Sequence, residues 1–226
     1  MRSSPASADL SDRLVASVGQ ATSARATPEL YRALLRLLSD GEPVTIAELA
    51  AAAGRASDVV QRAVAGWNDT EYDNQGRIIG WGLTLRPTPH RFEIDGKQLY
   101  TWCALDTLFF PAVIGRPARI ESPCAATGIP IRLKIDPTAG VGAVDPPTAV
   151  VSIVTPEQMS SVRAAFCNPG RFFATPDAAR DWQRRHPGME VLSVVDAHRA
   201  SRSLSAMLLD DSAPPLQHGL EKAGDR

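Results

Sequence analysis

Cysteine is scarce in this chain, with only Cys103, Cys124 and Cys167 among 226 residues. An odd number of widely separated cysteines excludes the disulfide framework of a small secreted domain and predicts reduced thiols. The sequence has no CxxC pair, and its four histidines lack the spacing of a zinc finger. A structural zinc site is therefore not expected.

Charge of one sign is also lacking, because 24 basic and 25 acidic residues leave a net charge of −1. Such a balance provides no strong attraction to nucleic acid or anionic lipid, and neither is expected as a partner. No apolar run approaches the roughly 18 residues of a membrane-spanning helix. The polar N-terminus lacks the apolar middle of a signal peptide, so we expect a cytoplasmic protein.

The first part of the sequence has the pattern of a helical domain. Helices are predicted at residues 8–19, 28–39, 45–54 and 57–67, followed by strands within 71–85 and 90–94. Thr45 and Glu48 form a capping-box pattern at the start of the third helix. We therefore predict an N-terminal extension with a short helix (1–27) and a winged-helix-like domain (28–95).

A winged-helix-like domain can bind DNA or can serve as a packing scaffold or a lid. The helix predicted at 57–67, in the place of a recognition helix, has a single basic side chain, Arg62. DNA recognition needs more phosphate and base contacts than one side chain provides, so the scaffold interpretation is favoured.

The second part of the sequence alternates irregularly between strand and helix patterns. We predict a helix at 99–110 ended by Pro111, a loop at 140–147, and further helices at 156–166, 176–185 and 196–209. Strands are expected at 117–122, 130–135, 148–154, 171–173 and 189–194. These patterns indicate an α+β fold, with a mixed, mainly antiparallel α+β catalytic domain at 96–210 and a mobile tail at 211–226.

The most informative residues are Cys103 and Asp106, three positions apart in a predicted helix. That spacing places their side chains on one face, roughly 5–6 Å apart at Cβ. The helix N-terminus is expected to lower the pKa of the thiol, and an apolar pocket formed by Trp102 and Phe109 is expected to raise that of the carboxyl. The alternative is a buried, inert cysteine beside a solvated aspartate.

The other two cysteines lie in different contexts. Cys124 ends a predicted strand, where it is either a third sulfur ligand or, as we favour, a packed structural thiol. Cys167 precedes the turn Asn168-Pro169-Gly170, and loops of this kind often present functional side chains to a cleft. We therefore favour a functional role for Cys167.

Several segments of the chain together match one known family more specifically than any short motif does. They are residues 70–73, 78–80, 82–86, 92–95, 99–108, 124–128, 166–167 and 172–174. On these segments the chain resembles the alkylmercury lyase (organomercurial lyase) family, from about residue 28 to about residue 210. The resemblance implies a winged-helix-like domain joined to an α+β catalytic domain.

The resemblance also implies roles for individual residues. The residues matching Cys103 and Cys167 hold mercury, Asp106 matches the residue that handles the proton, and Cys124 matches a structural cysteine. Asp106 would also lie beside the mercury of substrate and product. Asn168 is a departure, since some relatives have a second cysteine at that position, and its effect is a question the sequence leaves open.

The implied reaction is protonolysis of a carbon–mercury bond, which yields a hydrocarbon and Hg²⁺. Soft thiolates suit a soft metal ion, and Asp106 would relay a proton, in one version from the thiol of Cys103. No added cofactor is implied, because mercury is part of the substrate. The implied partners are organomercurials, low-molecular-weight thiols that release the product, and a mercuric reductase that accepts Hg²⁺.

One alternative function remains open from the sequence. A winged-helix, thiol-based metal sensor would use all three cysteines to bind a metal and would repress transcription. It accounts for the N-terminal domain but not for Asp106 or the near-neutral charge.

Overall fold

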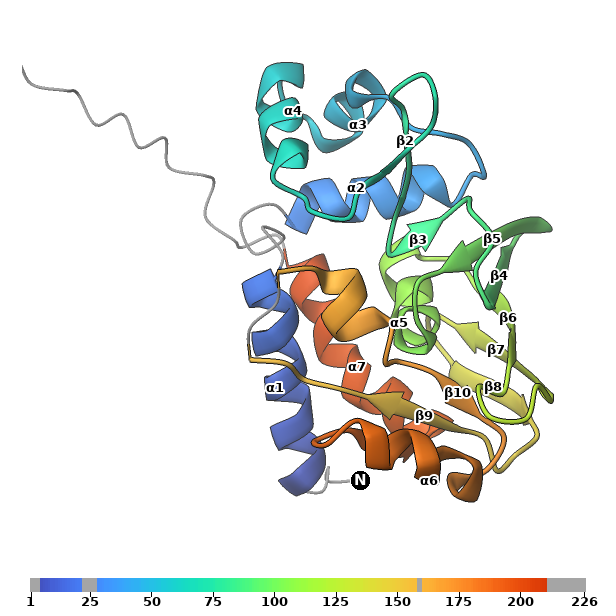
Figure 1. Cartoon of the computed structure of the whole chain (residues 1–226). Coiled ribbons are helices and arrows are strands. Elements are labelled where there is room, and N and C mark those ends of the chain that lie inside the picture. The colour runs from blue at the N-terminus through green and yellow to red at the C-terminus, as the bar shows by residue number, and fades with distance from the viewer. Residues whose placement is uncertain (1–4, 22–27, 158–159, 211–226) are drawn as a thin grey trace, which may run out of the picture.

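The computed structural model describes residues 5–21, 28–157 and 160–210 of the chain. Figure 1 shows a helical unit at the top, formed by residues 28–81, and a larger body of sheet and helices below it. The helices are α1 (Pro5–Ala21), α2 (Pro28–Leu38), α3 (Ile46–Ala53), α4 (Ser57–Ala65), α5 (Ala104–Ile114), α6 (Pro176–Arg185) and α7 (Val194–Leu209). A π-helical turn, Arg163–Cys167, precedes α6.

Two antiparallel sheets hold the strands together. The larger sheet has eight strands in the order β1-β2-β3-β5-β4-β6-β7-β8, and the smaller has the order β10-β9-β11. The strands of the larger sheet are β1 (Glu71–Tyr72), β2 (Ile78–Trp81), β3 (Leu83–Thr84), β4 (His90–Ile94), β5 (Lys97–Thr101), β6 (Ala118–Pro123), β7 (Pro130–Asp136) and β8 (Gly140–Asp145). Those of the smaller are β9 (Val150–Ile153), β10 (Phe172–Phe173) and β11 (Glu190–Ser193).

The helical unit has the predicted winged-helix-like arrangement. Thr45 caps α3 in a capping box with Glu48, as the sequence indicates, and Gly54 ends the helix in the left-handed conformation. Val44 then forms an antiparallel bridge with Ile78, which ties the loop before α3 to β2. The α+β fold class and the mainly antiparallel pairing are confirmed.

Helix α5 lies at the centre of the body and is buried along almost its whole length. Helix α5 packs extensively against α7 and less extensively against α2 and the sheets. Helix α1 packs along α7 on the left of Figure 1. Helices of the N-terminal segment therefore complete the core that surrounds α5. The N-terminal end of α5, which carries Asp106, lies beside the π-helical turn, which carries Cys167.

The helix predicted at 99–110 is wrong in its position. Residues 97–101 instead form β5, paired with β4 through a two-residue turn in which Asp95 and Gly96 both have positive φ, 50° and 77°. An Asp-Gly pair is the preferred sequence for such a hairpin turn. Pro111 lies inside α5 rather than ending it, because burial of the helix on all sides offsets the cost of a proline.

Two further predictions are corrected by the structure. The loop expected at 140–147 contains β8, which pairs with β7 from Gly140 to Asp145. The helix expected at 156–166 is not continuous. Among the described residues of this segment, the regular helical element is the π-helical turn Arg163–Cys167. The Asp69 carboxylate binds the Ser161 hydroxyl at 3.0 Å and the Arg163 amide at 3.2 Å, which fixes where this turn begins.

The remaining helices predicted at 28–39, 176–185 and 196–209 agree with α2, α6 and α7 to within two residues. The division of the chain at 27, 95 and 210 stays a prediction. The boundary at 95 coincides with the β4–β5 turn of a continuous sheet.

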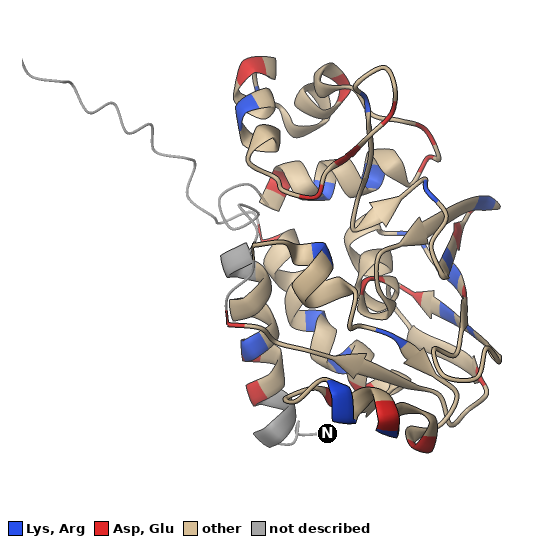
Figure 2. Cartoon of the chain, in the orientation of Figure 1, with Lys and Arg blue, Asp and Glu red and all other residues tan. Residues whose placement is uncertain are grey.

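Acidic and basic side chains are intermixed on the surface of the described residues, as Figure 2 shows most clearly along α6. None of the helices in the described ranges is long and apolar enough to cross a bilayer.

Candidate active site

Cys103 and Asp106 form a capping box at the N-terminus of α5. Cys103 is the N-cap residue, with extended backbone angles, and its sulfur accepts a hydrogen bond from the Asp106 amide at 3.4 Å. The Asp106 carboxylate in turn accepts a hydrogen bond from the Cys103 amide at 3.2 Å. Thiol and carboxyl are thus held on the first turn of α5 by the same bonds that begin the helix.

Cys167 joins this pair from a distant part of the chain. Its Sγ lies 4.0 Å from Asp106 Oδ2. One ligand atom from each of Cys103, Asp106 and Cys167 lies within 4.8 Å of the other two, and all three residues are buried. The structure therefore brings together the three residues proposed from the sequence to hold mercury, and among the described residues Cys124 is not part of the cluster.

Burial dominates the protonation of this cluster. It raises the pKa of Asp106 to about 7, although hydrogen bonds from Cys103 oppose the shift. Burial also raises the pKa of the Cys103 thiol above its ordinary value, and a hydrogen bond with Cys103 together with burial raises that of Cys167 further. The raised carboxyl pKa agrees with the sequence prediction, but the expected lowering of the Cys103 pKa is wrong because desolvation outweighs the helix N-terminus.

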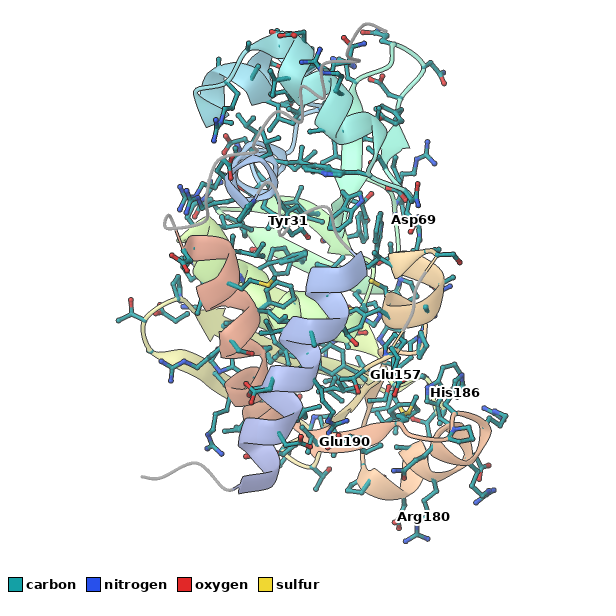
Figure 3. All side chains as sticks on the ribbon, turned by 90° about the vertical axis from the view of Figure 1, so that its left-hand side faces the viewer. Tyr31, Asp69, Glu157, Arg180, His186 and Glu190 are labelled. Atoms are coloured by element: carbon teal, nitrogen blue, oxygen red, sulfur yellow. The ribbon has the colours of Figure 1, made fainter. Side chains whose placement is uncertain are left out.

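Arg163 is a part of the site that the sequence did not reveal. Its guanidinium lies 5.0 Å from the centre of the Trp102 ring and is paired with the buried carboxylate of Glu71. Its charge partly opposes the rise in the pKa of Cys167, one turn further on. Figure 3 shows Asp69, which binds the backbone of this turn, at the junction with the helical unit. Residues of the N-terminal unit therefore hold the segment that carries Cys167.

A small cavity of about 30 Å³ lies against the cluster. Asp106, Cys167 and the predicted pocket residues Trp102 and Phe109 line it, and most of its other residues are apolar. The space holds about one or two water molecules. Binding of an organic molecule therefore requires the surrounding side chains to move.

The cavity also has walls that sequence patterns did not predict. Tyr31 of α2 and Trp81 of β2 come from the helical unit, while Val18 comes from α1 and Leu204 from α7. In Figure 3, Tyr31 lies where the helical unit meets α1 and α7. Burial raises the pKa of the Tyr31 hydroxyl well above its ordinary value, so this group stays neutral.

Among the described residues, neither Cys124 nor His90 belongs to the cluster of Cys103, Asp106 and Cys167. Cys124 follows β6 in a turn whose backbone is closed by hydrogen bonds of 2.8 and 2.9 Å to Ile129 and Gly128, and its side chain is buried. His90 is also buried, with Nδ1 2.8 Å from the Ser122 hydroxyl. Burial lowers the His90 pKa to about 3, so the ring is neutral.

The raised pKa of Asp106 predicts a pH-dependent stability. The folded chain holds this proton up to about pH 7, whereas an unfolded aspartate releases it near pH 4. Its stabilising contribution is therefore complete below about pH 4 and is lost as the pH rises toward 7, by about 1.4 kcal/mol per pH unit. Asp106→Asn keeps a hydrogen-bond acceptor for the Cys103 amide but removes this titration.

We expect the difference in unfolding free energy between Asp106→Asn and the parent chain to grow in favour of the variant from pH 5 to pH 7. Urea unfolding at fixed pH values measures it. A difference that stays constant across this range would show that Asp106 is not shifted in the folded chain.

Taken together, these features define a class: a winged-helix-like scaffold joined to an α+β body that encloses a buried cluster of two thiols and a carboxyl group. Two family models match the chain. The model described as alkylmercury lyase matches residues 83–206, and the model described as the helix-turn-helix domain of alkylmercury lyase matches residues 8–82.

Curated relatives extend the match to nearly the full length. An alkylmercury lyase from Streptomyces lividans is 53% identical over 206 residues, covering 91% of this chain and 95% of the relative. One from Bacillus cereus is 54% identical over 82% of this chain and 84% of the relative. One from Pseudomonas putida is 47% identical over 81% and 86%. The chain belongs to the alkylmercury lyase family, and the resemblance found in the sequence is confirmed.

A solved structure shares the fold. The crystal structure of the mercury-bound form of MerB2 superposes with a TM-score of 0.72 at 22% identity, and the match covers 89% of this chain and 99% of that one. At this identity the comparison supports the fold alone.

Proposed function

We propose that this chain cleaves the carbon–mercury bond of organomercurials by protonolysis, with Cys103 and Cys167 as mercury ligands and Asp106 as the proton relay. One observation carries the proposal: two sulfurs and a carboxylate oxygen lie within 4.8 Å of one another, although Cys167 is 61 positions from Asp106 in sequence. Thiolates bind soft metals in preference to carboxylates. The carboxyl therefore remains available for the proton.

In the first step the Cys103 sulfur displaces the ligand X of R–Hg–X, and its proton leaves with X as HX. In the second step the Cys167 sulfur joins the mercury and gives its proton to the Asp106 carboxylate. Because Cys103 has already lost its proton in the first step, Cys167, whose Sγ lies 4.0 Å from Asp106 Oδ2, is the proton source in this sequence.

In the third step the Asp106 carboxyl delivers the proton to carbon while the carbon–mercury electron pair becomes the new C–H bond. The hydrocarbon R–H leaves, and Hg²⁺ stays on two thiolates. An acid with a pKa of about 7 holds and releases a proton near neutral pH, which is the condition for efficient general acid catalysis. The walls are mostly apolar and the cavity is small, so they limit access of water, the competing proton source.

The same walls support a substrate with an apolar alkyl or aryl group. Aromatic side chains of Tyr31, Trp81, Trp102 and Phe109 line the cavity, and they provide dispersion contacts to such a group. Mercury enters as part of the substrate, and no added cofactor forms part of the proposal. External low-molecular-weight thiols, or a mercuric reductase, accept the Hg²⁺ from the buried site.

The metal-sensor alternative receives less support. The basic side chain of α4, Arg62, is paired with Asp58 one turn earlier, at 2.9 Å. Tyr31 and Trp81 of the helical unit instead form part of the cavity wall. The unit thus acts as a scaffold for the site, which is the interpretation favoured from the sequence.

The test is a sealed-vial assay with methylmercury chloride or phenylmercury acetate and an excess of a small thiol. We expect methane or benzene in the headspace, with repeated turnover. A chain that binds the mercurial, releases no hydrocarbon and shifts an operator DNA in a gel would instead be the sensor.

A further inference from the structure

Gly170 connects the two cysteine-bearing segments through its backbone. Its carbonyl accepts a hydrogen bond from the Ala104 amide at 3.0 Å, and its amide donates to the Cys167 carbonyl at 2.9 Å. Ala104 is the first residue of α5, directly after Cys103. The loop that follows Cys167 is thus bonded to the start of the helix that carries Cys103.

The approach between these segments leaves little room for a side chain at position 170. A Cβ built there would lie 3.2 Å from Cys103 Cβ, 3.3 Å from the Cys167 carbonyl oxygen and 3.6 Å from Cys103 Sγ. Carbon atoms in favourable contact are about 3.5–4.0 Å apart. The backbone of Gly170 does not have a positive φ, so the close approach, rather than backbone conformation, accounts for glycine here.

The loop is also fixed on its other side. The Pro169 carbonyl accepts hydrogen bonds from the Ser152 hydroxyl at 2.7 Å and from Trp182 Nε1 at 3.1 Å. The Arg171 amide donates to the same Ser152 hydroxyl at 2.9 Å. These bonds resist retreat of the loop, so we expect a methyl group at position 170 to displace Cys103 or Cys167 by a few tenths of an ångström.

We propose that Gly170 is a positioning residue that sets the spacing of the Cys103 and Cys167 sulfurs, so that both bind one mercury atom. The inference rests on the proposed two-thiolate function. A displacement of the order of 1 Å costs up to about a hundredfold in rate. A shift of a few tenths of an ångström is therefore expected to cost about tenfold.

The test compares Gly170→Ala with the matched control Gly142→Ala. Gly142 also lacks a positive φ, and a Cβ there would lie equally close, 3.2 Å, to the Lys134 carbonyl oxygen. It lies on β8, an edge strand of the larger sheet. Both variants therefore gain the same methyl group in the same kind of close contact, but only Gly170→Ala affects the cysteines.

We expect Gly170→Ala to lower kcat about tenfold with KM changed by less than about threefold, and to lose Hg²⁺ to a competing dithiol at about tenfold lower dithiol concentration. Gly142→Ala should match the parent in all three. Dithiol competition is the readout that a general loss of stability does not move, since it is measured on folded protein with bound Hg²⁺.

A second variant tests the same proposal without adding a side chain to the loop. Ala104→Pro replaces the amide hydrogen that binds the Gly170 carbonyl with a ring carbon, which breaks this 3.0 Å bond and pushes the carbonyl away from the start of α5, at a helix position where proline is favoured. The extended Cys103 backbone, φ −141° and ψ 167°, suits the residue before a proline. This variant should show the same fall in kcat and in Hg²⁺ retention.

The proposal is overturned if Gly170→Ala keeps the kcat of the parent and holds Hg²⁺ as tightly against the dithiol. If Gly170→Ala does not fold, the same result with Ala104→Pro overturns it. Cys103→Ser and Cys167→Ser in the same assay separate this failure from failure of the proposed function. Inactive serine variants beside a fully active Gly170→Ala would refute only the role of Gly170.

Discussion

Replacing either Cys103 or Cys167 with serine is expected to lower hydrocarbon release by at least about 10³-fold, equivalent to about 4 kcal/mol of activation free energy. A serine hydroxyl is a hard, weakly acidic ligand and does not replace a thiolate on mercury. Serine is a preferred N-cap residue, so Cys103→Ser retains the cap of α5. Loss of activity in this variant therefore reports loss of the sulfur rather than of the fold.

Cys124→Ser is the matched control for this pair, since it makes the same chemical change in a buried cysteine outside the cluster. We expect it to keep the parent rate and to lose about 1–3 kcal/mol of stability, because a hydroxyl replaces an apolar thiol in a buried position. Headspace hydrocarbon and urea unfolding measure the two effects. Normal turnover in Cys103→Ser, or a large loss in stable Cys124→Ser, would contradict the assignment.

Asp106→Ala is expected to bind organomercurials but to release hydrocarbon about 10²–10⁴-fold more slowly, the usual contribution of a general acid. Both sulfurs remain in this variant, and its lost step is delivery of the proton to carbon. Single-turnover release from the preformed complex measures this step apart from binding.

Alanine also removes the acceptor of the Cys103 amide, so Asp106→Asn serves as the control. Asparagine keeps that acceptor but cannot carry the proton, and it should be as slow as alanine. An asparagine variant that turns over at the parent rate would show that position 106 acts through the helix cap alone.

Much of the fold could be predicted because local patterns agree with the final structure. The capping box of α3 and the helix α6 follow from caps and hydrophobic spacing that tertiary packing does not override. The helix predicted at 99–110 overlooks two local signals. The Asp95-Gly96 pair is a typical hairpin-turn sequence, so a strand follows it, and Pro111 lies inside a helix that is buried on all sides rather than at its end. The strand β8 has little local signal, because it is rich in glycine and depends on pairing with β7.

The site was predictable in part. The spacing of Cys103 and Asp106 placed two of its groups together, whereas the approach of Cys167 depends on long-range packing that spacing does not encode. The turn after Cys167 favoured a functional role for that residue, and the family resemblance grouped it with Cys103 as a mercury ligand. Arg163 and Tyr31 were missed because a lone arginine and a helical tyrosine have no distinguishing pattern, and their positions result from the contact between the helical unit and the body.

The most direct test of the account is the coordination of mercury after one turnover, measured by X-ray absorption or in a crystal of the parent chain treated with one equivalent of an organomercurial. The account predicts Hg²⁺ bound by the sulfurs of Cys103 and Cys167 together, with the organic group gone and the Asp106 carboxyl adjacent. Mercury held by a single protein sulfur after hydrocarbon release, or held at Cys124, would contradict it.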